Sequence, residues 1–397
     1  MMNRREFTPA RAGRSGGPAR PKALGRLRRT RLPLIAVLGL ALFATAATGA
    51  NAQQFAGVNT HVLDTYGDGW SQLRIQYAAM LLQNVPATQP KVVRIDLRWN
   101  QLEPQGAGNY DAGYVSQIDN VVSWAQGWGM KPLFVVLGTP CWASSAPTAV
   151  TQGCANTSAG DAYPPTKPRR YADAMRYLAQ RYGSRVAGWE LWNEPNLSYF
   201  WNSANPAADY VKLVGAAYPA IKSVSTVPVV AGALSLSDYD FTGRLYADGI
   251  KGKLDVLSIH PYSFQCSPLA LGSDPCLSPY GTEASFSDGP PAVRSVMLQY
   301  GDRSPLWLTE VGWNTSTAAS GVGLSTQATY VDQAYRQVPN WSSAVGSAVN
   351  VQGVFSYELQ DEGTDPGNAE ENYGLLYVNG GQKPAASVFE QDAALLK

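Results

Sequence analysis

The sequence contains few of the residues on which metal and redox chemistry depend. Its 397 residues include only four cysteines and two histidines, His61 and His260, and no Cys-x-x-Cys pair occurs. These numbers disfavour a zinc site, and we expect neither a metal nor an organic cofactor. A glycine-rich phosphate loop after an early apolar run is also absent, which disfavours a doubly wound nucleotide-binding sheet.

Charged side chains are also scarce, at 15% of residues, and their distribution along the chain is uneven. Of the 31 Lys and Arg residues, ten fall within the first 31 positions, together with only one of the 30 acidic residues. The chain after residue 52 therefore carries 21 basic and 29 acidic residues, although the whole sequence has a net charge of +1. An acidic chain without basic runs is not expected to bind nucleic acid.

The basic N-terminal region is followed by an uncharged apolar stretch, Leu32–Ala50, and then by small residues. This pattern indicates a secretory signal over residues 1–52, with cleavage after Ala52. An uncleaved membrane anchor is one alternative, because the stretch is just long enough to cross a bilayer. A twin-arginine signal containing Arg4 and Arg5 is another. We expect residues 53–397 to form the mature catalytic domain, a monomer without a membrane segment, in a secreted or periplasmic location.

The four cysteines fall into two segments that are rich in glycine, proline and serine. An even number of cysteines in an exported chain indicates disulfide bonds. Three pairings are possible. We expect Cys141 to pair with Cys154 and Cys266 with Cys276, because each of these bonds closes a single loop.

Eight apolar runs recur along the chain, and they are too uniformly apolar for a sheet with one face in water. These runs are Phe55–Thr60, Val92–Leu97, Pro132–Leu137, Val186–Trp192, Val227–Ala231, Val256–His260, Leu306–Glu310 and Gly353–Tyr357. Helical periodicity lies between several of them, for example over residues 110–125, 171–182 and 210–221. Alternating strands and helices predict an α/β fold with parallel βαβ units, and eight such strands predict a closed (β/α)8 TIM barrel. A doubly wound open sheet is the alternative.

Two loops of this predicted barrel are long. Residues 138–170 follow the third apolar run, and residues 261–290 follow the sixth. Loops after barrel strands surround the C-terminal mouth, where barrel enzymes carry their active sites. The cysteines in both loops are expected to brace this mouth.

Two glutamates stand at the ends of apolar runs and are surrounded by tryptophan. Glu194 follows the fourth run, within Trp189–Asn196, and Glu310 ends the seventh run, within Leu306–Trp313. In a closed barrel these ends face one another across the mouth. Retaining cleavage of a glycosidic bond requires two carboxyl groups about 5–5.5 Å apart. We therefore predict that Glu194 is the general acid/base and Glu310 the nucleophile. A helix cap or an arginine partner is the alternative role for each.

Polar residues near these glutamates are candidates for holding the sugar or the catalytic groups. Asn193 precedes the predicted acid and is expected to donate a hydrogen bond to a sugar hydroxyl. Arg94 lies inside the second apolar run and cannot be buried without a partner. It either hydrogen-bonds a catalytic carboxylate or forms an internal ion pair with Asp96 or Glu103. Glu190 precedes Glu194 by four residues, and we expect it one layer deeper, with a structural role.

Further candidates follow the third, sixth, seventh and eighth runs. Tyr262 is expected to donate a hydrogen bond to the nucleophile, and His260 is expected to orient it; a histidine satisfied within the core is the alternative. Trp142 and Trp313 are expected to stack on sugar faces. Glu358 is predicted to bind a sugar hydroxyl and is the main competitor for a catalytic role.

These segments resemble the clan A glycoside hydrolases, and most of all family 39 and its bacterial relatives that cut exopolysaccharides. The resemblance covers residues 55–380. It implies a barrel with Glu194 as acid/base, Glu310 as nucleophile and Asn193 against the 2-hydroxyl. Several families of the clan have tryptophan where this chain has Tyr357. The matching segments are Arg94, Trp192–Pro195, His260–Tyr262, Thr309–Gly312, Tyr357-Glu358, Asp361-Glu362 and Asn372–Leu376.

Taken together, the sequence predicts a secreted retaining glycoside hydrolase that acts on a polysaccharide. All eleven tryptophans lie in the predicted mature part, which suits a neutral ring-shaped ligand. We expect endo cleavage of a β-linked polysaccharide or exopolysaccharide. The alternatives are a catalytically inactive carbohydrate-binding or matrix protein and a transglycosylase on the same scaffold.

Overall fold

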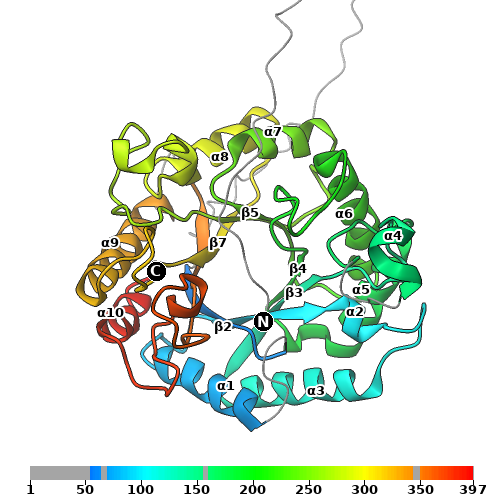
Figure 1. The fold of residues 1–397 in the computed structure, drawn as a ribbon, viewed down its shortest axis with the longest axis horizontal. Helices are drawn as coiled ribbons and strands as arrows, with labels where there is room; N and C mark the ends of the chain where they lie inside the picture. Colours follow the sequence, from blue (N-terminus) through cyan, green and yellow to red (C-terminus); the bar gives the residue numbers. More distant parts are fainter. Residues whose placement is uncertain (1–53, 64–68, 155–159, 343–348, 397) are drawn as a thin grey trace, which may run out of the picture. The chain divides into compact units, whose positions relative to one another are not determined.

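The eight predicted strands form a closed barrel in a computed structural model that describes residues 54–63, 69–154, 160–342 and 349–396. Every neighbouring pair is parallel, and the order around the barrel follows the order along the chain (Figure 1). Strands β1 and β8 close the ring, with Phe55 opposite Gly353. The (β/α)8 prediction is confirmed and the open-sheet alternative is wrong. The predicted signal, residues 1–52, lies outside the described residues.

Each predicted apolar run overlaps one strand. The strands are β1 (Phe55–Thr60), β2 (Lys91–Arg98), β3 (Met130–Leu137), β4 (Gly188–Leu191), β5 (Val229–Ser235), β6 (Val256–His260), β7 (Leu306–Val311) and β8 (Val351–Ser356). The largest difference is in β5, which continues four residues beyond the predicted end at Ala231. A bulge between Ala231 and Leu234 absorbs Gly232, whose φ of 116° suits glycine, and the strand then continues to Ser235.

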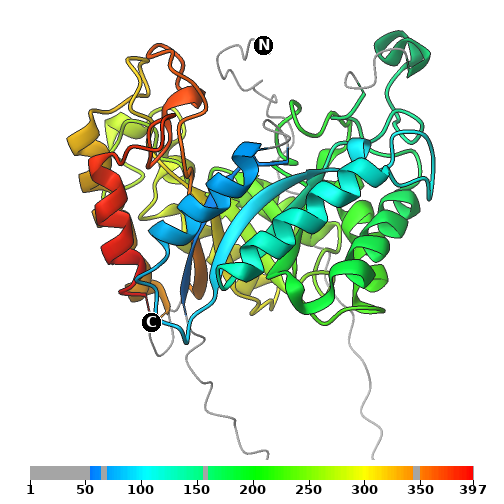
Figure 2. The same ribbon diagram turned by 90° about the horizontal axis from the view of Figure 1, so that it is seen from below.

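Helices surround the barrel on the outside (Figures 1 and 2). They are α1 (Gly69–Leu81), α2 (Trp99–Leu102), α3 (Ala112–Gly127), α4 (Thr148–Thr151), α5 (Pro168–Tyr182), α6 (Pro206–Lys222), α7 (Tyr239–Ala247), α8 (Gly289–Gln299), α9 (Leu324–Ser342) and α10 (Pro384–Ala393). The predicted helical segments 171–182 and 210–221 lie within α5 and α6, and the segment 110–125 starts two residues before α3. Within the described ranges, no helix is both long and apolar enough to span a bilayer.

Side chains that point into the barrel form successive layers along its axis. The lowest layer is apolar and consists of Phe55, Val92, Leu133, Val230, Val256, Trp307 and Phe355. Strand β2 shows how the layers arise, because alternate residues of a strand face the same side. Val92 belongs to the apolar layer, Arg94 is buried among polar groups above it, and Asp96 lies nearer the mouth. The barrel is therefore closed below by hydrophobic packing and becomes polar towards its C-terminal end.

Two disulfide bonds brace the loops at this end. Cys141 is bonded to Cys154 in the loop after β3, and Cys266 to Cys276 in the loop after β6. The sequence-local pairing is thus confirmed, and the described residues contain no free cysteine.

Replacement of Cys141 and Cys154 by serine is expected to lower the free energy of unfolding by about 3 kcal/mol, because a cross-link over this loop length restricts the unfolded chain. Urea unfolding of the double variant beside the wild-type protein measures this loss. An unchanged transition midpoint would show instead that the loop opens independently of the barrel.

Candidate active site

Glu194 and Glu310 lie close together at the mouth, as the sequence predicts. Both are almost buried, with 7% of each residue exposed. His260 at the end of β6 joins them, since its Nδ1 lies 3.0 Å from Glu194 Oε1 and 3.5 Å from Glu310 Oε2. One carboxylate oxygen of each glutamate and a ring nitrogen of His260 lie within 4.8 Å of one another. This close approach suits retaining chemistry and is too short for the wider pair that inverting enzymes use.

The backbone departs from regular strand geometry where it presents these two side chains. Strand β4 ends at Leu191, one residue before its predicted end, and the chain then turns with positive φ at Trp192 (73°) and Glu194 (42°). In β7 the register with β8 shifts between Leu308 and Val311. Strict alternation would place Thr309 and Glu310 on opposite faces, but both make contacts inside the barrel. Irregularities of this kind re-aim side chains and are common at functional sites.

Glu310 is held by two strong hydrogen-bond donors. Arg94 Nη1 lies 2.7 Å from its Oε1, and the hydroxyl of Tyr262 donates to Oε2 at 2.6 Å. Burial by itself would raise the pKa of Glu310. Electrostatic interactions with His260 and Arg94 and the hydrogen bond from the Tyr262 hydroxyl together bring the pKa of this carboxyl group below its usual range. This carboxylate is therefore kept ionised, as a nucleophile must be.

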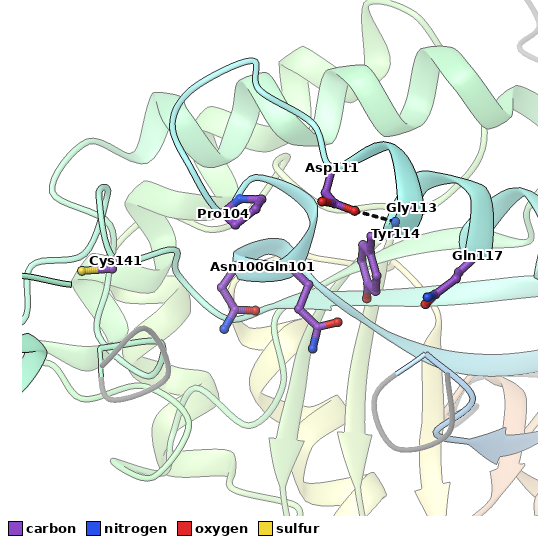
Figure 3. A pocket seen from close by; sticks show the side chains of 8 residues that line it. All are labelled: Asn100, Gln101, Pro104, Asp111, Gly113, Tyr114, Gln117 and Cys141. Carbon is purple, nitrogen blue, oxygen red and sulfur yellow. Dashed lines mark hydrogen bonds between the residues drawn. The ribbon is translucent and has the colours of Figure 1, made fainter. Parts of the chain in front are cut away.

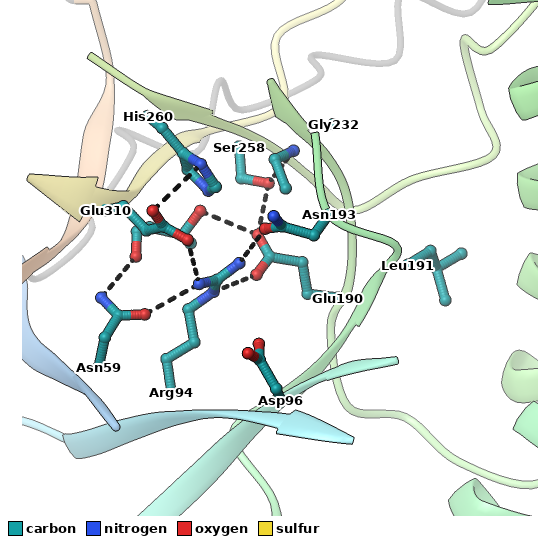
Figure 4. Close-up of polar contacts among 12 residues, drawn as sticks. Asn59, Arg94, Asp96, Glu190, Leu191, Asn193, Gly232, Ser258, His260 and Glu310 are labelled. Carbon is teal, nitrogen blue, oxygen red and sulfur yellow. Dashed lines mark hydrogen bonds and ion pairs between the residues drawn. The ribbon is translucent and has the colours of Figure 1, made fainter. Parts of the chain in front are cut away.

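Arg94 is the centre of a buried polar network (Figure 4). Besides Glu310, its guanidinium donates to Glu190 at 2.5 Å, to Asn59 at 2.9 Å and to Asn193 at 3.0 Å. The sequence left open a contact with a catalytic carboxylate or an ion pair with Asp96 or Glu103. In the structure Arg94 binds Glu310, the predicted nucleophile, whereas Asp96 binds His61 and Glu103 accepts hydrogen bonds from Trp99 and Gly108.

Glu190 and Asn193 occupy the positions expected for them. Glu190 is fully buried below the glutamate pair, and one of its oxygens also accepts hydrogen bonds from Ser258 at 2.6 Å and Thr309 at 2.9 Å. Its role is structural. The Oδ1 of Asn193 accepts a hydrogen bond from Arg94. This contact orients the amide so that its Nδ2 is available to a substrate hydroxyl.

A second polar cluster lies beside the glutamates at the ends of β1, β2 and β8. His61 donates from Nδ1 to Asp96 at 2.7 Å, and its Nε2 lies 3.4 Å from Glu358 and 3.7 Å from Glu362. Glu358, the predicted hydroxyl-binding residue, is only 1% exposed. Burial and the neighbouring Glu362 raise its pKa well above the usual value. Sequence reasoning did not assign a role to His61 or Asp96 in this cluster, although strand alternation from Asn59 and Arg94 would place both on the inner face.

The two tryptophans predicted to stack on sugars differ in their surroundings. Trp142 is partly exposed, and its indole N–H donates to the carbonyl of Glu103 at 2.6 Å. Trp313 is only 2% exposed, and its N–H donates to Ser263 at 3.1 Å. So little ring surface remains that a sugar cannot stack on Trp313. The prediction for this residue is corrected: it is a packing residue that ties β7 to the loop after β6.

Three tyrosines make a wall next to Glu310. Tyr262, Tyr357 and Tyr373 contact one another edge to face, with ring centroids 5.3–6.1 Å apart. Tyr357 occupies the end of β8, where several families of clan A have tryptophan. Tyr373, which lies in the segment after β8, was not predicted as a site residue.

A separate pocket of about 520 Å³ lies among the loops after β2 and β3 (Figure 3). Its lining residues are Asn100, Gln101, Pro104, Asp111, Gly113, Tyr114, Gln117 and Cys141. Neither Glu194 nor Glu310 lines it, so the chemistry indicated by the glutamate pair belongs to the barrel mouth and not to this pocket.

Comparison with known structures agrees with the barrel. A family 39 glycoside hydrolase from the gut symbiont Bacteroides cellulosilyticus WH2 superposes with a TM-score of 0.63 at 24% identity, covering 87% of this chain and 64% of its own. A monomeric β-xylosidase from Caulobacter crescentus CB15 gives 0.60 at 17% identity, with 85% and 67% covered. The β-glucosidase of Pyrococcus furiosus gives 0.58 at 15%, with 86% and 95% covered. At these identities the likeness shows the fold.

The family itself is shown by a sequence model. The model described as Cellulase (glycosyl hydrolase family 5) matches residues 45–343, more than half of the chain. The predicted membership of clan A is thereby confirmed, because family 5 and family 39 both belong to it, and family 39 enzymes are among the structural relatives. The chain belongs to the cellulase family, glycosyl hydrolase family 5, within clan A of the glycoside hydrolases.

Proposed function

We propose that this protein is a glycosidase that works by double displacement, with Glu310 as nucleophile and Glu194 as general acid/base. The observation that carries this assignment is the difference between the two carboxylates. Glu310 receives hydrogen bonds from Arg94 and Tyr262, which favour its ionised form, whereas Glu194 contacts the ring of His260. Different partners push the pKa values of two carboxyl groups apart, so that one group acts as the nucleophile and the other as the acid.

The steps follow from these positions. Glu194 gives its proton to the glycosidic oxygen while Glu310 attacks the anomeric carbon, so that the leaving sugar departs and a glycosyl ester forms. Glu194 then takes a proton from water, whose oxygen attacks the same carbon and releases Glu310. Asn193 Nδ2 donates to the 2-hydroxyl, a hydrogen bond that strengthens in the transition state. Glu358 binds another hydroxyl of the same sugar.

For the substrate, we propose a β-linked polysaccharide that is cut internally outside the cytoplasm. The similarity to a β-xylosidase and a β-glucosidase supports the β-linkage. The partly exposed Trp142, in the loop after β3, supports a site that contacts several sugars along a chain. The signal-like pattern of residues 1–52 and the two disulfides support export, and the secreted exopolysaccharide of the source organism is the substrate to test first.

The test is release of reducing ends from a panel of β-linked polysaccharides and from that exopolysaccharide. Release of mixed oligosaccharides early in the reaction is expected, and release of single sugars alone would contradict endo cleavage. Products longer than the starting oligosaccharide would identify a transglycosylase. Binding to one polymer without release of reducing ends would favour the inactive binding protein.

Replacement of Tyr262 by phenylalanine is expected to lower kcat/KM by about 10- to 100-fold, since it removes one donor from the nucleophile. The hydroxyl of Tyr262 helps to lower the pKa of Glu310, so its loss raises that pKa. The acid limb of the pH profile of kcat/KM should therefore move to higher pH. A lower rate with an unchanged acid limb would mean that Tyr262 contacts the substrate and does not tune Glu310.

A further inference from the structure

The cluster at the ends of β1, β2 and β8 has the features of a metal-binding site. His61 Nε2, a carboxylate oxygen of Glu358 and one of Glu362 all lie within 4.8 Å of one another. The two oxygens nearest the histidine are 3.4 and 3.7 Å from Nε2. Zinc binds nitrogen and oxygen ligands at about 2.0–2.2 Å in a tetrahedron, which places neighbouring ligand atoms about 3.3–3.6 Å apart. The two distances from Nε2 are close to this spacing, so the three side chains are near enough to bind a common ion.

The orientation of His61 is fixed from the opposite side of its ring. Nδ1 lies 2.7 Å from Asp96 Oδ2, and a carboxylate acceptor there requires the proton to be on Nδ1. In the neutral ring, the lone pair is then on Nε2 and points towards Glu358 and Glu362. A carboxylate behind a histidine is the usual support for a histidine that binds zinc, because it sets the tautomer and raises the basicity of the ligand.

Two atoms of the cluster are buried without a hydrogen bond. His61 Nε2 makes none, and neither does Oε1 of Glu358, a residue that is only 1% exposed. Buried polar atoms normally have a partner, and an unsatisfied one calls for a group that binds there. Three carboxyl groups, those of Asp96, Glu358 and Glu362, surround the ring of His61, and such a concentration of acidic groups suits a cation.

We propose that His61, Glu358 and Glu362 bind a divalent first-row metal ion, with zinc as the best fit to one imidazole and two carboxylates. Asp96 supports the site by holding His61 in position. Three protein ligands leave a fourth position for water or a sugar hydroxyl. Metal binding here stands independently of the roles proposed for Glu194 and Glu310. It shares Glu358 with the proposed sugar-binding site, so a bound metal ion would lie beside the sugar.

The catalytic residues offer a weaker alternative site. Glu194, His260 and Glu310 also have one atom each within 4.8 Å of one another. Glu310, however, is already paired with the guanidinium of Arg94 at 2.7 Å, and a dication beside that charge would be repelled. A test must therefore separate the two clusters.

Isothermal titration of the chelator-treated protein with ZnCl2 provides the test, together with anomalous diffraction at the zinc edge from crystals soaked in the same salt. We expect one saturable site, with zinc affinity lowered at least about tenfold in His61→Gln and Glu362→Gln and by about 10- to 100-fold in Asp96→Asn. The anomalous peak should lie between His61, Glu358 and Glu362.

The matched control is Glu194→Gln, which removes a ligand from the alternative cluster and should leave zinc affinity unchanged. Glu362 is the most informative position, because its side chain is 25% exposed and its replacement should not disturb the fold. Circular dichroism of the metal-free variants checks this. The proposal is overturned by any of three results: no saturable binding, equal affinity in Glu362→Gln, or loss of binding in Glu194→Gln.

Discussion

The Glu310→Gln variant is expected to lose at least about 10³-fold in kcat while keeping the fold of the wild-type protein. The amide is nearly the same size as the carboxylate but cannot attack the anomeric carbon, so the covalent step is lost. The fold should survive because Arg94, which loses one negative partner, remains paired with Glu190 at 2.5 Å. The measurement is the steady-state rate on an activated aryl β-glycoside, with circular dichroism as the check on folding. Activity equal to that of the wild-type protein would refute the assignment of Glu310.

Alanine variants with added azide provide the control that distinguishes the two glutamates. In Glu194→Ala, Glu310 still forms the glycosyl ester, and azide replaces water on the open face to give a β-glycosyl azide. In Glu310→Ala, azide occupies the space of the missing carboxylate and displaces the leaving group directly, which gives the α-glycosyl azide. If the two variants gave the opposite products, the roles of Glu194 and Glu310 would be reversed.

The barrel and the proximity of Glu194 and Glu310 could be predicted because they depend on local patterns. Buried parallel strands are uniformly apolar, so a polar residue inside such a run is conspicuous, as Arg94 is within β2. The same argument placed Glu194 and Glu310 at strand ends, and Tyr262 next to the nucleophile. All of these residues meet in the structure.

Features that depend on contacts between distant segments could not be predicted in this way. The register shift in β7 turns both Thr309 and Glu310 inward. A sequence pattern in which alternate residues face the barrel interior does not predict such a shift. Trp313 has the sequence context of a sugar platform, but the loop after β6 covers it. Helix α7 was missed because it spans only nine residues. Its local signal was Asp238, whose side chain caps the helix by accepting a hydrogen bond from Phe241 N.

Replacement of Arg94 by leucine is expected to destabilise the protein by about 3–5 kcal/mol and to abolish most of its activity. Arg94 is the cation that neutralises Glu190, which is fully buried, and removal of one member of a buried ion pair leaves the other charge uncompensated. Activity falls as well, because Glu310 loses a donor at 2.7 Å and Asn193 loses the contact that orients its amide. Urea unfolding and the rate on an aryl β-glycoside measure the two effects.

A double variant separates the structural from the catalytic contribution of Arg94. In the double variant Arg94→Leu with Glu190→Gln, no charge remains at position 190. Ser258 and Thr309 donate hydrogen bonds to Glu190 in the wild-type protein, and the glutamine oxygen can still accept them. Much of the lost stability should therefore return, since a buried charge without a partner costs more than a neutral group that keeps its hydrogen bonds. The rate should stay low, because nothing in this change restores the donor to Glu310. If the double variant were as unstable as Arg94→Leu alone, Arg94 would stabilise the barrel mainly through Asn59, Asn193 and Glu310, and not through Glu190.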